Sequence, residues 1–125
     1  MGIPKPLLRL RIAIINAERD LVAVELELKA ITKLNFGSKR DKVGALADNF
    51  MNNLSIAQQG LPPELVKGCE RLSAKVEGIK NLFWEINKEN YEFIKRRVQQ
   101  QIATVRREIQ SVTRALGEEM AREAA

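Results

Sequence analysis

The chain has 125 residues, with 21 Lys and Arg against 16 Asp and Glu, and its formal net charge is +5. Hydrophobic residues make up 45% of the chain, which argues against disorder and is enough for one small core. There is no His, which removes the commonest metal ligand and the usual general base. The single Cys excludes an internal disulfide and a cysteine-rich metal site, so we expect no metal and no cofactor.

The first predicted element is a long helix over 6–34, with a proline in its first turn. Apolar residues recur along it at spacings of three and four, which predicts one buried face. This row consists of Leu7, Leu10, Ile14, Ala17, Leu21, Val24, Leu28 and Ile31. A second apolar row lies roughly opposite and consists of Leu8, Ile12, Ile15, Val22 and Leu26. A helix that is apolar on two sides is normally buried on two sides, so this helix is either the central helix of a bundle or a helix shared with another subunit.

The second predicted helix covers 39–59. Gly37 suits a left-handed position that ends the first helix, and Ser38 resembles the N-cap of the second. Gly60 is expected to close this helix. Its predicted buried face consists of Val43, Leu46, Phe50, Leu54 and Ala57, with Ala47 and Met51 at the margin.

A third helix over 63–87 and a fourth over 90–120 are predicted from two further apolar rows. The first row consists of Leu65, Cys69, Leu72, Val76, Ile79, Phe83 and Ile86. The second consists of Ile94, Val98, Ile102, Val105, Ile109, Val112, Leu116 and Met120. Gly68 and Gly78 are candidate positions for a close helix approach.

A turn at Asn87–Asn90 and an uninterrupted helix through it are both open. We favour the turn, because a helix over 63–121 would span roughly 85–90 Å. A compact domain of this size has a radius of gyration of only about 14 Å. The segment after Leu116 is expected to fray, and no strand or internal repeat is apparent. The predicted fold is an all-α antiparallel bundle of about four helices, with long first and last helices, in a single domain over 1–125.

The charge excess is confined to residues 93–116, which contain six Lys or Arg residues and one acidic residue, Glu108. Helical spacing puts Arg96, Arg107 and Arg114 on one line opposite the apolar row, with Lys95 and Arg106 beside it. Such a basic face is typical either of a solvated surface or of phosphate contacts with RNA or DNA. No aromatic stacking group is apparent on it, so we expect backbone contact with little sequence preference.

Trp84 and Cys69 have alternative interpretations. Trp84 lies beside its apolar row, either closing the end of the bundle or anchoring a partner. Cys69 lies on an apolar row and is expected to be a small, reduced core residue, because no His can activate it. No segment reaches the ~18–20 apolar residues of a membrane span, so we expect a cytoplasmic protein without a membrane partner.

Three local patterns carry a resemblance to a known family. They are Leu34-Asn35-Phe36-Gly37-Ser38-Lys39, Leu61-Pro62-Pro63-Glu64-Leu65 and Lys80-Asn81-Leu82-Phe83-Trp84-Glu85. Their layout resembles a degenerate HEPN domain, a small helical bundle found in many dimeric RNases of toxin and defence systems. The resemblance implies that Lys80, Asn81 and Glu85 occupy the places of the family's Arg, Asn and His. Because the chain has no His, it implies the scaffold and the dimer but not RNA cleavage.

The sequence thus favours a non-enzymatic helical subunit that assembles with itself or with a partner protein. The predicted interface residues are Leu8, Ile12, Ile15, Val22, Leu26 and Trp84. The alternative is a small nucleic-acid-binding component of a nucleoprotein or defence complex, acting through Lys95, Arg96, Arg106, Arg107 and Arg114. No small-molecule substrate is expected.

Overall fold

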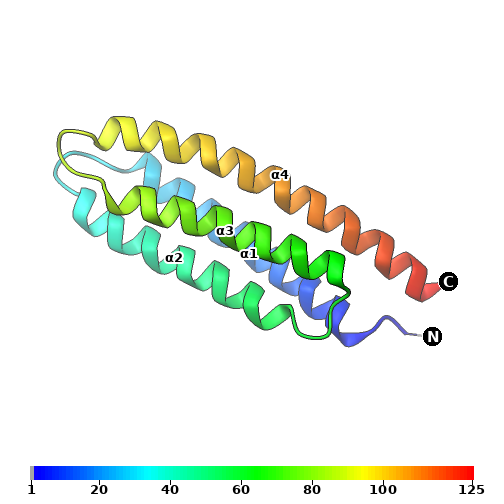
Figure 1. The fold of residues 1–125 in the computed structure, drawn as a ribbon. Helices are drawn as coiled ribbons and strands as arrows, with labels where there is room; N and C mark the ends of the chain where they lie inside the picture. The colour runs from blue at the N-terminus through cyan, green and yellow to red at the C-terminus, as the bar shows by residue number, and fades with distance from the viewer. Residues whose placement is uncertain (1) are drawn as a thin grey trace.

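The computed structural model describes residues 2–125, which form four helices packed side by side (Figure 1). α1 spans Lys5–Lys29, α2 Phe36–Ala57, α3 Pro63–Trp84 and α4 Tyr91–Ala124. Each helix packs on the next one along the chain, and α1 also packs on α4. The described residues contain no strand. The predicted all-α bundle is therefore confirmed, with α4 as its longest helix.

The four apolar rows meet in one core. Every residue of the first row of α1 is buried, and so is every residue predicted for the core face of α3. The same holds for α4 up to Leu116. In α2 the predicted core residues are buried except Leu46, which is only half-buried, and Ala47 takes its place in the core. The periodicity of each row therefore determines which side of each helix faces inward.

The first loop ends α1 earlier than the sequence predicts. Asn35 accepts a hydrogen bond at Oδ1 from the Thr32 N–H (2.7 Å) and donates from Nδ2 to the Ala30 carbonyl (2.9 Å). These bonds stop α1 at Lys29 and make Asn35, not Ser38, the N-cap residue of α2. Gly37 lies in the first turn of α2 without a positive φ, whereas Gly60 has φ +79° in the next loop, as a closing glycine should.

The loop between α3 and α4 has the same pattern of asparagine hydrogen bonds. Asn90 accepts from the Asn87 N–H (2.7 Å) and donates from Nδ2 to the Glu85 carbonyl (3.0 Å). Both Asn87 and Thr32 accept further backbone N–H groups of their own loops. The favoured turn is thus confirmed, but α3 ends at Trp84, three residues before the predicted boundary at 87.

The two loops belong to two equivalent helical hairpins that follow each other in the chain. Ala30–Phe36 reads AITKLNF and Glu85–Tyr91 reads EINKENY, 55 positions later. At the same offset, buried positions match along both hairpins, for example Leu10 with Leu65, Leu21 with Val76, Val43 with Val98 and Leu54 with Ile109. The expectation of no internal repeat is therefore wrong. Few of the matched residues are identical, so the repeat becomes visible only through burial and loop hydrogen bonds.

The end of α4 also differs from expectation. The helix does not fray after Leu116 or stop at 120 but continues to Ala124. Met120 packs partly buried against the core, and Arg122 forms an ion pair with Glu119 one turn earlier. These contacts support the last turns of the helix. Figure 1 shows this end beside the start of α1, while loops 30–35 and 85–90 lie together at the opposite end of the bundle.

We predict opposite effects of alanine at the two glycines of α3. A Cβ at Gly68 would lie 2.8 Å from Val112 Cγ2 of α4, whereas a Cβ at Gly78 would have no neighbour within 4 Å. Gly78→Ala should therefore stabilise the fold by about 1 kcal/mol through helix propensity. Gly68→Ala should destabilise it by roughly 1–2 kcal/mol, because overpacking outweighs that gain. Urea denaturation of both variants measures the difference, and equal stabilisation by both would contradict the close approach at Gly68.

Candidate interaction surfaces

The second apolar row of α1 lies on the outside of the bundle. We call Leu8, Ile12, Ile15, Val22 and Leu26 the α1 stripe. Their exposed fractions are 39%, 60%, 51%, 50% and 60%, although the opposite side of the same helix is buried. With Arg19 included, the positions follow spacings of 4, 3, 4, 3 and 4, which is the pattern of a coiled-coil seam. The stripe is therefore the most continuous apolar side of any helix that faces solvent in this chain.

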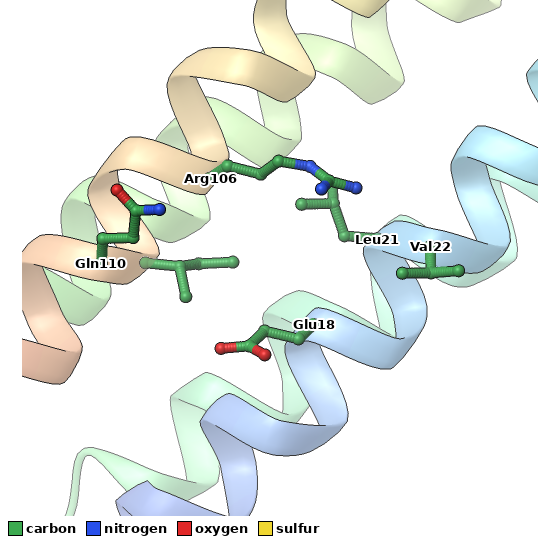
Figure 2. A pocket seen from close by; sticks show the side chains of 6 residues that line it. Glu18, Leu21, Val22, Arg106 and Gln110 are labelled. Atoms are coloured by element: carbon green, nitrogen blue, oxygen red, sulfur yellow. The ribbon is translucent and has the colours of Figure 1, made fainter.

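A hollow of about 230 Å³ lies on one flank of the α1 stripe, between α1 and α4 (Figure 2). Its lining residues are Glu18, Leu21, Val22, Arg106, Ile109 and Gln110. In Figure 2, Arg106 extends from α4 across the hollow towards Leu21 of α1, and Glu18 borders the other side. Arg106 forms an ion pair with Glu25. One of the five predicted phosphate-binding cations is thus already engaged with an acid of α1.

A second hollow, of about 170 Å³, lies on the other flank of the stripe, between α1 and α2. It brings Ile12 together with Ile56, whose exposed fraction is 59%. Ile56 falls outside the buried row of its own helix, so the periodicity of the sequence did not point to it. The apolar surface therefore extends from α1 onto α2.

The predicted basic line is exposed on the outer side of α4. Arg96, Arg107 and Arg114 face solvent, and no carboxylate within residues 2–125 lies within 4.0 Å of their guanidinium nitrogens. Lys95 is half-buried. Phe93 is 54% exposed, and the Arg97 guanidinium lies 6.0 Å from its ring centroid. An exposed aromatic therefore does lie beside the basic line, contrary to expectation.

Trp84 belongs to a different surface from the α1 stripe. It is 64% exposed at the end of α3, and the Arg40 guanidinium lies 5.5 Å from its ring centroid. The same guanidinium lies 5.9 Å from the Phe36 ring and donates a hydrogen bond to the Ile86 carbonyl. Trp84 thus covers one face of an arginine that joins α2 to the second asparagine loop.

The residues that carry the HEPN resemblance lie near the end of α3. Lys80 Nζ donates to Asp48 Oδ1 of α2 (2.6 Å), Asn81 is exposed, and Glu85 is the C-cap residue. Comparison with family models, with curated proteins and with solved structures found no match. The resemblance therefore stays a prediction.

Residues 2–125 contain neither a cluster of metal ligands nor a membrane-spanning helix. No group of three or more His, Cys, Asp or Glu residues there is arranged to hold a metal ion. None of the four helices is both long enough and apolar enough to cross a membrane. The candidate surfaces of the described chain are therefore the α1 stripe, the basic line of α4 and the Trp84 region.

Cys69 lies in the core, as the sequence predicts. It is completely buried on α3, and burial raises the pKa of its thiol to about 11. The neighbouring Glu70 charge contributes the smaller part of this rise in pKa. Because the thiolate is the reacting species, a raised pKa and burial together make this cysteine inert in the folded protein.

We predict that Cys69 reacts with a thiol reagent only after unfolding. At pH 8 the folded protein should release almost no chromophore from an aromatic disulfide reagent, because the thiol is protonated and covered. One equivalent should react in concentrated guanidinium chloride. Rapid stoichiometric labelling of the folded protein would contradict the buried position of this thiol.

Proposed function

We propose that this protein is a non-catalytic helical subunit that assembles with another copy of itself or with a partner protein through the α1 stripe. The observation that carries the proposal is a comparison within the chain. The residues of α3 that occupy the equivalent outer positions, 55 places later, are Pro63, Lys67, Glu70, Glu77 and Asn81. Ala74 is the equivalent of Arg19. All six are exposed, and none carries a large apolar side chain.

The comparison supports an assembly role because the two hairpins have the same architecture. The bundle tolerates a polar outer side at α3, so the apolar outer side of α1 is not needed for folding. Each aliphatic side chain of the α1 stripe would contribute about 1.5–3 kcal/mol if it were fully buried. Contiguous apolar side chains on a surface mark interaction sites. Contact with another protein is therefore the simplest reason for the difference between α1 and α3.

We predict that Ile15→Gln combined with Val22→Gln releases the protein from its native assembly. Both side chains are half exposed, so the fold should lose little stability and the far-ultraviolet circular dichroism should not change. A tagged wild-type chain in extracts of its native cells should elute well above its monomer mass of 14.1 kDa, and the variant at that mass. Size-exclusion chromatography with light scattering measures this.

The matched control places glutamines at Ala74 and Asn81, which are also seven residues apart on an exposed helix face. Neither pair of substitutions changes the net charge. The control should elute with the wild type. Release by both pairs, or by neither, would overturn the role of the α1 stripe.

The basic line of α4 favours a second candidate function, contact with the backbone of RNA or DNA. Its support is that Arg96, Arg107 and Arg114 are exposed, whereas Arg106 is engaged with Glu25. The equivalent positions of the first hairpin are Asp41, Asn52 and Gln59, so it has no such line. Lysine and arginine side chains neutralise phosphates without reading bases. A subunit of a nucleoprotein or defence complex, on an inactive HEPN-like scaffold, would use both surfaces at once.

We predict that replacing Arg96, Arg107 and Arg114 with Gln weakens binding to every duplex and single strand alike. Because three fewer counterions are released, the slope of log affinity against log salt should become shallower by about 2–3. Fluorescence anisotropy across a salt series measures both effects. The control replaces Lys67, Lys75 and Lys88 with Gln. These three exposed cations lie in α3 and in the loop after it, and their loss lowers the net charge by the same amount. Equal losses in both triple variants would argue against a localised surface.

A further inference from the structure

We infer that the partner of the α1 stripe is the α1 stripe of a second copy, antiparallel to the first, with the two-fold axis passing beside Ala17. This inference rests on the proposed function and names its partner. The stripe is symmetric in sequence about position 17. Leu8 is as far before it as Leu26 is after it, and the same holds for Ile12 with Val22 and for Ile15 with Arg19.

An antiparallel pairing at this register brings all six positions of the seam into opposed layers. Leu8 of one copy meets Leu26 of the other, and Ile12 meets Val22. Each of these layers occurs twice because of the two-fold axis. Leu8 and Leu26, the ends of the seam, are 18 positions apart, or about 27 Å of helix. Four aliphatic layers are thus formed from side chains that are exposed in the single chain.

The central layers place Arg19 of one copy opposite Ile15 of the other. A long arginine stem can cover an isoleucine while its guanidinium reaches the edge of the interface. At that edge, Glu18 of the other copy borders the hollow between α1 and α4. Neither Glu18 nor Arg19 has an ion-pair partner within residues 2–125 of its own chain. The pairing therefore sets the two Glu18 side chains opposite each other at the axis, where the two Arg19 guanidiniums lie near enough to offset their repulsion.

The flanking charges support the same arrangement. On the α4 side of the seam, antiparallel pairing sets Arg11 of one copy against Glu25 of the other. Arg11 has no acid partner within its own described chain, and Glu25 already accepts from Arg106 on its other side. Each Glu25 would then lie between two arginines, one from each copy.

A parallel pairing fits less well. In a parallel seam every position meets its own copy, so Arg19 would face Arg19 in the middle of an apolar interface. Arg11 would lie nearest Asn16, and Glu25 nearest Ala30, so no opposite charges would pair. The charges therefore select the antiparallel direction, which the aliphatic residues alone would not.

The first part of the experiment measures mass. Sedimentation equilibrium of the purified full chain over a concentration series should show a monomer–dimer equilibrium. Ile12→Glu should shift it to monomer. Arg19→Leu should tighten the dimer about tenfold, because an apolar side chain replaces a charge opposite Ile15. Arg107→Leu makes the same chemical change on the outer side of α4 and should leave the dissociation constant unchanged.

The second part measures direction by cross-linking, with Cys69→Ala as the background. Leu8→Cys and Leu26→Cys are prepared as separate variants and oxidised mildly, alone and as an equimolar mixture. The antiparallel seam should give a disulfide dimer only in the mixture, because each cysteine lies about 27 Å from its own copy. A parallel seam would cross-link each variant alone.

Each outcome bears on the inference. Cross-linking of the single variants, or a strict monomer unaffected by Arg19→Leu, would overturn it. In the second case, release from the native assembly by Ile15→Gln with Val22→Gln would still uphold the proposed function with a different protein as partner. A disulfide between Leu8→Cys and Leu26→Cys chains, together with a tighter dimer for Arg19→Leu but not for Arg107→Leu, would establish the antiparallel homodimer.

Discussion

The core of this bundle contains only apolar residues, and the remaining architecture depends on that constraint. Among the described residues no polar or charged residue is buried, so helix packing in the interior involves apolar contact and backbone hydrogen bonds within each helix. An interior of this kind specifies which helix faces turn inward but does little to fix where each helix ends. The two asparagine loops supply that second constraint. By binding the backbone three and five residues away, Asn35 and Asn90 set the ends of α1 and α3 and the starts of α2 and α4.

The sequence predicted the inward faces well for a simple physical reason. Burial in a bundle follows the 3.6-residue period, and apolar rows such as Leu65 to Ile86 show that period directly. Helix ends were predicted less well, because the rows continue past them. Ile31 and Ile86 are buried and lie on their rows, yet both belong to loops. The hydrogen bonds that end the helices come from Thr, Asn and backbone groups, whose partners cannot be read from periodicity.

For the candidate surfaces too, the sequence predicted the features of a single helix but not the contacts between helices. The sequence placed the α1 stripe and the arginine line of α4 on helix faces, since both depend on spacing within one helix. It could not show that Arg106 pairs with Glu25, that Ile56 lies beside Ile12, or that Trp84 covers Arg40. Each of these facts depends on how two helices are positioned against each other. The repeat was also hidden, because equivalent positions share burial far more often than identity.

The repeat offers an argument about specificity that neither hairpin gives alone. Two hairpins with the same inward pattern have diverged outside, one with an aliphatic row on its first helix and the other with an arginine line on its second. A wholly aliphatic row would pair in several registers of similar energy. In the proposed dimer, a shift by one heptad leaves only four of the six seam positions opposed, and it moves Arg19 opposite Val22 or Leu8. Arg19 weakens the interface equally in each of these registers, because it lies opposite an aliphatic residue in all of them, but it disfavours the parallel direction, in which it would meet the Arg19 of the other copy. The register is set by the aliphatic layers, of which a shift by one heptad leaves two of four. A single charged residue in the middle of the α1 stripe thus exchanges some affinity for one defined direction of pairing, as polar residues in coiled-coil seams do.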